Sequence, residues 1–132
     1  MDIATIDAWF EANRRPILDD YFALLRFPSV GADPGRLGDC QACAGWIRAF
    51  LEGLGFEAEV VSGDPAKPPL VVAERPAEGA AHTVLVYGHY DVQPVDPIEQ
   101  WETPPFEPTE RGGRVYARGA QDDKGQWFAL LQ

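Results

Sequence analysis

The residues with the clearest chemical potential are a histidine and an aspartate separated by one position, His89 and Asp91. Neutral imidazole is a common ligand of zinc, and a nearby carboxylate can hold the second ring nitrogen and raise the basicity of the first. The pair is therefore a candidate metal ligand with its supporting group. A short His-x-Asp motif also occurs where a histidine is hydrogen-bonded within a turn, so both interpretations stay open on these residues alone.

A second acidic cluster, Asp122 and Asp123, lies further along the chain between Arg118 and Gly125. One carboxylate can bridge two cations through its two oxygens, which is the arrangement that two-metal hydrolases use. The competing interpretation is structural, because an aspartate in front of a helix is a favoured N-cap and interacts well with the helix dipole. Taken alone, this cluster favours capping.

The segments around both clusters indicate how they are positioned. Residues 83–87 read Thr-Val-Leu-Val-Tyr, which is typical of a strand covered on both faces inside a helix-flanked sheet. Such sheets bind ligands at the carboxyl ends of their strands, where His89 and Asp91 follow. The apolar spacing of Trp127, Phe128 and Leu131 predicts a helix that begins after the acidic cluster.

The remaining pattern predicts an α/β layered domain. Two helical segments are expected before Phe27, and an apolar stripe from Cys40 to Leu54 predicts a further helix that Gly55 ends. Short strands are expected around 56–61 and 70–73, and a hairpin turns at Gly112 and Gly113. Cys40 and Cys43 lie on the apolar stripe, so we interpret them as buried packing residues and not as a redox or zinc pair.

Composition limits the possible partners. The chain has 132 residues, 45% of them apolar, with 11 basic and 21 acidic side chains and a net charge of −10. This charge argues against nucleic acid and against acidic membrane surfaces, since binding to phosphates draws on lysine and arginine. The sequence contains no long apolar span and does not begin like a signal peptide, so we expect a soluble, cytoplasmic protein.

Considered together, three segments resemble a known family: Val84 to Pro94, Trp101 to Phe106, and Tyr116 to Gly125. Their order and spacing are similar to those of zinc dipeptidases of the aminoacylase, acetylornithine deacetylase and carboxypeptidase G superfamily. The Gly-His-x-Asp-Val-Gln-Pro and Trp-x-x-x-Pro-Phe elements look closer to its carnosinase-like cytosolic dipeptidases than to its deacetylases. The resemblance is strong between Val84 and Gly125 and unspecific in the earlier helices.

The resemblance implies a role for each matching residue. His89 would bind one zinc ion, and Asp91, assigned to the catalytic apparatus, would hold its imidazole. Asp122 would bridge the two zinc ions, and Asp123 would support it. The family also tends to hold the peptide bond after the bridging aspartate in cis. Residues 1–132 would be the amino-terminal portion of a three-layer α/β/α zinc-peptidase catalytic domain whose sheet is incomplete.

The implied activity is hydrolysis of dipeptides by a water that two zinc ions activate. The family's Glu-Glu pair, which supplies the general base, its remaining ligands and its lid domain would fall beyond Gln132. We therefore expect these 132 residues alone to be inactive and to bind metal weakly, and the full-length protein to be a homodimer formed through the lid. Two alternatives are a deacylase of N-acyl amino acids from the same superfamily and a non-catalytic, degenerate module.

Overall fold

The first helix differs from the sequence prediction. In the computed structural model, which describes residues 2–132, α1 runs without interruption over Ile3–Leu25, where two helical segments were expected. Asp2 caps it, because its carboxylate accepts a hydrogen bond from the N–H of Thr5. Pro16 lies inside the helix, but it and Ala12, whose carbonyl it leaves free, are exposed, so water can satisfy that carbonyl.

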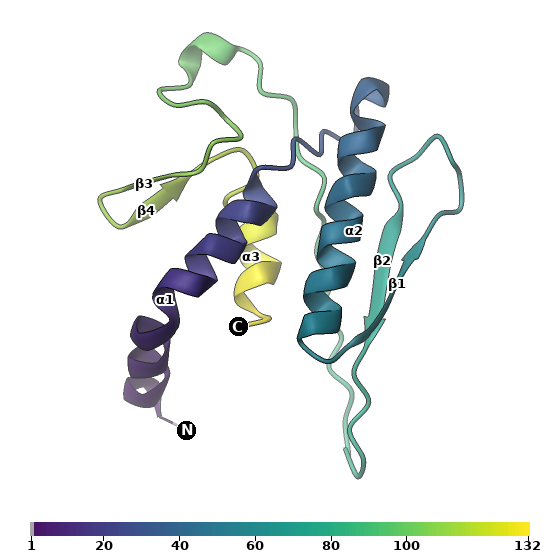
Figure 1. Cartoon of the computed structure of the whole chain (residues 1–132), viewed down its shortest axis with the longest axis vertical. Helices are drawn as coiled ribbons and strands as arrows, with labels where there is room; N and C mark the ends of the chain where they lie inside the picture. The colour runs from purple at the N-terminus through teal and green to yellow at the C-terminus, as the bar shows by residue number, and fades with distance from the viewer. Residues whose placement is uncertain (1) are drawn as a thin grey trace.

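The second helix follows the prediction closely. A short 3₁₀ turn, Pro34–Arg36, leads into α2, Leu37–Gly53, and Gly55 adopts a positive φ just after it. The strands β1 (Glu57–Val61) and β2 (Leu70–Glu74) pair antiparallel, with Glu57 opposite Glu74 and Val61 opposite Leu70. In Figure 1 this two-stranded sheet flanks α2 on one side, while α1 and α3 lie on the other.

The core forms where the three helices meet. α3, Lys124–Ala129, brings Phe128 between two aromatic rings, with Tyr21 of α1 stacked at 5.4 Å and Phe50 of α2 at 5.3 Å. Around this contact lie the other buried members of the cluster: Leu24, Cys43, Ile47, Leu51 and Trp127. Cys40 and Cys43 are fully buried and unpaired, which confirms that they serve as packing residues.

The expected central strand over residues 83–87 is not formed in the described part of the chain. The side chains of Val84, Leu85 and Tyr87 are 84%, 90% and 86% exposed, so neither face of the segment is covered. A strand needs a neighbour to bond its backbone, and no described strand pairs with these residues. The prediction of a buried strand was therefore wrong for this structure, although the chain is paired just after the site, where Val92 forms a parallel bridge with Val30.

The segment between the two candidate clusters contains a second small sheet. After a 3₁₀ turn at Ile98–Gln100, β3 (Thr109–Arg111) and β4 (Arg114–Tyr116) form the predicted hairpin around Gly112 and Gly113. Ion pairs from Arg14 to Glu110 and from Arg26 to Glu107 join this region to α1. The mixed helix-and-strand architecture is thus as predicted, and none of the described helices has the length and apolarity that crossing a bilayer requires.

The hydroxyl of Tyr21 makes a testable contribution to this packing. It donates to the carbonyl of Ala120 at 2.5 Å, and burial raises the pKa of Tyr21 from 10.0 to about 12. The folded state thus retains a proton that the unfolded state releases, so the stabilisation is complete below pH 10 and is lost as the pH rises through about 12. We predict that urea midpoints measured between pH 8 and 12 fall less steeply for Tyr21→Phe than for wild type. Equal slopes would contradict the prediction.

Candidate metal centre

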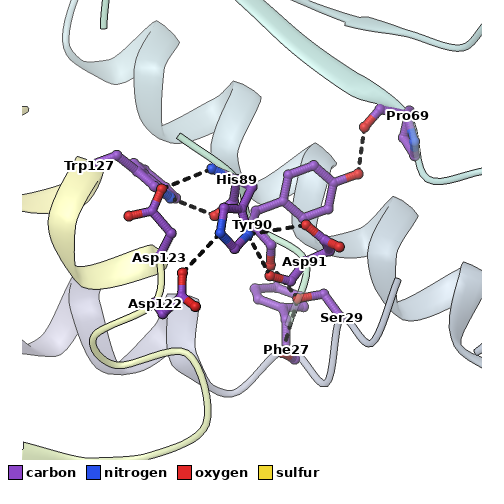
Figure 2. A network of polar contacts seen from close by, with 9 residues as sticks. All are labelled: Phe27, Ser29, Pro69, His89, Tyr90, Asp91, Asp122, Asp123 and Trp127. Atoms are coloured by element: carbon purple, nitrogen blue, oxygen red, sulfur yellow. Dashed lines mark hydrogen bonds and ion pairs between the residues drawn. The ribbon is translucent and has the colours of Figure 1, made fainter. Parts of the chain in front are cut away.

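The structure brings the three predicted site residues, His89, Asp91 and Asp122, together (Figure 2). The Nδ1 atom of His89 lies 3.0 Å from the carbonyl oxygen of Asp91 and 3.2 Å from its Oδ1. The opposite ring nitrogen, Nε2, lies 3.0 Å from Oδ1 of Asp122, which is 33 residues away in sequence. Each ring nitrogen therefore faces oxygen atoms, and the predicted proximity of His89 and Asp122 is present.

This environment determines the protonation of the imidazole. Burial lowers the pKa of His89, but hydrogen bonds to Asp91 and Asp122 and the negative charges of both carboxylates outweigh it, so the pKa lies above its ordinary value. Two acceptors are best satisfied by a ring that carries a proton on both nitrogens. With Nδ1 held by Asp91, the nitrogen that can exchange its proton for a cation is Nε2, which points at Asp122.

Asp123 has a different role from the capping that the sequence favoured. Its carboxylate does not cap a helix, because α3 begins after Asp123 without a side-chain hydrogen bond from it. Its Oδ2 accepts instead from the backbone N–H of His89 at 3.1 Å. The peptide bond between Asp122 and Asp123 is cis, as the resemblance implied. The two adjacent carboxylates thus address different parts of His89, its side chain and its backbone.

Further contacts fix the backbone that carries His89 and Asp91. The indole of Trp127 donates to the carbonyl of His89 at 3.2 Å, and the hydroxyl of buried Ser29 donates to the carbonyl of Tyr90 at 2.7 Å. The hydroxyl of Tyr90 reaches the carbonyl of Pro69 at 2.6 Å. Ser29 and Tyr90 were not predicted from the sequence, and Trp127 was used only as part of a predicted helix. Their acceptors are backbone carbonyls, which leave no signal in the sequence.

A glycine allows the closest of these approaches. A Cβ atom on Gly88 would lie 2.6 Å from the indole of Trp127, well inside contact distance. Only a residue without a side chain lets the indole cover the chain at the entry to the site. Close packing against Trp127 therefore requires glycine directly before His89, and a larger residue there would displace either the histidine or α3.

The site opens into a hollow of about 250 Å³ whose polar lining includes His89, Gln93, Arg118 and Asp122. The side chain of His89 is 42% exposed and that of Asp122 is 80% exposed, so both are reachable from solvent. An imidazole nitrogen and a carboxylate oxygen are donors that suit zinc. Among the described residues, however, no three potential ligands are arranged so that they could hold one metal ion together. The residues present fit part of a metal site, and their role as ligands stays a prediction.

Comparison with known proteins places this geometry in context. Residues 85–132 match Peptidase family M20/M25/M40. Succinyl-diaminopimelate desuccinylase of Acidovorax ebreus is 37% identical over 82% of the chain, and that of Variovorax paradoxus is 42% identical, also over 82%. The chain spans 30% and 27% of these two relatives.

Solved structures share the fold. Human carnosine dipeptidase 1 superposes with a TM-score of 0.86 at 26% identity, covering 97% of this chain and 29% of its own. The di-peptidase Dug1p of Saccharomyces cerevisiae gives 0.83 at 25% identity over 92% of this chain and 28% of its own. The M20 family metallo-carboxypeptidase Sso-CP2 of Sulfolobus solfataricus gives 0.77 at 38% identity, over 87% and 25%.

These matches agree with one another and with the motifs at the site. The matched family region contains His89, Asp91 and Asp122, and the superposition covers 28% and 29% of the two dipeptidase chains. The chain belongs to the M20 metallopeptidase superfamily.

Proposed function

We propose that the protein is a zinc-dependent hydrolase that cleaves the amide bond of dipeptides. The observation that carries this proposal is the approach of two potential ligands from distant parts of the sequence: Nε2 of His89 faces Oδ1 of Asp122 at 3.0 Å in a solvent-accessible hollow. Family membership and the likeness to two dipeptidases support it.

The residues of this chain would each perform one task. Asp91 acts through His89, because its carbonyl oxygen and Oδ1 hold Nδ1 and leave Nε2 as the nitrogen that can exchange its proton for a cation. Asp122 offers a carboxylate whose two oxygens can serve two cations. Asp123 and Trp127 hold the backbone of His89 at its N–H and its carbonyl. Bound zinc would supply a water of lowered pKa and polarise the scissile carbonyl.

A second substrate class has its own support. The two relatives compared above are succinyl-diaminopimelate desuccinylases at 37% and 42% identity, and their name describes removal of a succinyl group. Cleavage of a dipeptide and of an N-succinyl amino acid breaks the same kind of bond, an amide, so one metal centre suits both. We rank dipeptides first because the motifs around His89 and Trp101 look closer to dipeptidases and because two dipeptidases share the fold.

Three related assignments remain proposals. We propose that residues 1–132 form the amino-terminal portion of the catalytic domain, in keeping with the share of the relatives that they cover. We also propose that the full-length protein is a homodimer and that it acts in the cytoplasm.

The ranking of substrates predicts a kinetic difference. We expect the full-length protein with zinc to hydrolyse unmodified dipeptides with a kcat/KM at least about tenfold above that for N-succinyl amino acids, because tenfold corresponds to only 1.4 kcal/mol of transition-state discrimination. Release of free amino acid from matched substrates, one dipeptide and one N-succinyl derivative of the same amino acid, measures it. The reverse ratio would favour the desuccinylase assignment.

The chain's two histidines provide a matched test of the metal site. In the full-length protein, we expect His89→Ala to abolish measurable high-affinity Zn²⁺ binding in calorimetric titration, because it removes the nitrogen ligand. His82→Ala should titrate like wild type, since His82 is exposed and lies before the segment that leads to the site. Equal binding by all three proteins would contradict the assignment of His89, and no binding by wild type would favour the non-catalytic module.

The support given by Asp91 predicts a graded effect. We expect Asp91→Asn to weaken Zn²⁺ binding about 10- to 100-fold, the range typical of losing a carboxylate that orients a metal-binding histidine. Asp7→Asn is the matched control, because Asp7 is exposed near the start of α1. Competition with a chelator of known affinity measures both, and an unchanged affinity for Asp91→Asn would show that the backbone carbonyl alone holds the ring.

A further inference from the structure

Lys124 is a fully buried cation that the proposed chemistry does not use. Its exposed fraction is 0%, and its Nζ donates to the carbonyl of Leu24 at 3.2 Å and to that of Phe27 at 2.9 Å. In the described part of the chain, no carboxylate lies within ion-pair distance of this ammonium group. Its charge is instead balanced by the carbonyls at the carboxyl end of α1, where the helix dipole is negative.

Tyr21 makes a second connection between the same two parts of the molecule. Its hydroxyl, three residues before Leu24 on α1, donates to the carbonyl of Ala120 at 2.5 Å. Gly125 permits this approach, because a Cβ atom there would lie 2.1 Å from the carbonyl oxygen of Ala120 and 2.7 Å from the hydroxyl of Tyr21. The loop 120–124, which carries Asp122, is thus bonded to α1 at both of its ends.

The chain that follows α1 holds the other half of the site. Ser29, two residues after Phe27, donates its hydroxyl to the carbonyl of Tyr90 and accepts a hydrogen bond from the N–H of Val92 at 2.8 Å. The segment that carries His89 and the loop that carries Asp122 are therefore fastened to one continuous stretch, residues 21–30. The hydrogen bonds that hold the loop and those that hold the His89 segment involve different residues.

We propose that the carboxyl end of α1, through Lys124 and Tyr21, positions Asp122 against His89. We name these two side chains with their three carbonyl contacts the α1 clamp. Lys124 and Tyr21 are positioning residues, because they touch neither the ring of His89 nor the carboxylate of Asp122 and act only through the loop backbone. For metal binding, the inference rests on the proposed function; for the His89–Asp122 contact, it does not.

Lys124→Met is the main test variant, since methionine keeps an unbranched apolar side chain and removes the donors. We expect Lys124→Met to weaken Zn²⁺ binding at least about tenfold, within the range for lost supporting hydrogen bonds. Tyr21→Phe should weaken it roughly fivefold, as the loss of one neutral hydrogen bond predicts. The controls are Lys67→Met, at the chain's other lysine, which is exposed, and Tyr116→Phe, whose ring lies on the surface under Arg111.

Two measurements separate positioning from general stability. The Zn²⁺ affinity of the full-length protein and its variants is determined by chelator competition at a temperature where circular dichroism shows each to be folded, so that lost stability alone leaves it unchanged. In the metal-free protein, NMR records the ring proton on Nε2 of His89, which the bond to Asp122 protects from exchange. We expect that signal in wild type and in both controls and expect it to be lost in Lys124→Met.

Each outcome then decides the inference. A folded Lys124→Met with wild-type affinity and an unchanged ring proton overturns it, and if that variant does not fold, Tyr21→Phe decides by the same two readouts. Wild type that binds no Zn²⁺ contradicts the proposed function, whereas the ring proton still tests the α1 clamp. Loss of the ring proton in Lys124→Met, with both controls like wild type, is the result that we expect.

Discussion

The arrangement of the candidate site depends on satisfying the backbone groups at the end of α1. A helix leaves its last carbonyls without intrahelical partners, and burying them unpaired is costly. Here the carbonyl of Leu24 in the last turn of α1 and that of Phe27, just beyond the helix, accept hydrogen bonds from Lys124. Ser29 then donates its hydroxyl to the carbonyl of Tyr90, and its own carbonyl accepts from the N–H of Val92. Because these partners come from two segments that are far apart in sequence, the hydrogen bonds at and just after the end of α1 also bring those segments together.

Local patterns in the sequence predicted the elements that depend on local interactions. The apolar stripe from Cys40 to Leu54 gave α2 because residues three and four apart share a helix face, and Gly55 adopts the positive φ that ends it. The two glycines at 112 and 113 likewise predicted the hairpin between β3 and β4. In each case the information lies within a few residues, so no knowledge of the tertiary fold was needed.

The failures have the opposite character. Residues 83–87 carry the composition of a buried strand, yet a strand is defined by its neighbours, and composition does not supply them. Pro16 misled in the other direction, because the cost of a proline inside a helix depends on whether water reaches the freed carbonyl, which is a property of the folded surface. Both depend on tertiary context, which a pattern within a short window cannot express.

The candidate site was predicted by a combination of residue types and a family resemblance. His89, Asp91 and Asp122 have side chains with recognisable chemistry, and the structure places both aspartates within hydrogen-bonding distance of the ring of His89. The residues that hold them were not predicted, since Ser29, Trp127 and Lys124 all bind backbone carbonyls. Every residue has a backbone carbonyl, so the residue type of the acceptor gives no indication that such a contact exists.

The charge distribution explains why this arrangement suits a cation. Asp91, Asp122 and Asp123 all direct carboxylate oxygens at His89, two of them at its ring and one at its backbone N–H, in a chain whose net charge is already −10. A single imidazolium offsets only one of three neighbouring negative charges. Lys124 forms no ion pair with any of the three carboxylates, and its ammonium group donates to the carbonyls of Leu24 and Phe27. Arg118 adds one positive charge to the lining of the hollow, but the two carboxylates in contact with the ring are those of Asp91 and Asp122, so a divalent cation between Nε2 and Asp122 would gain from their negative charge.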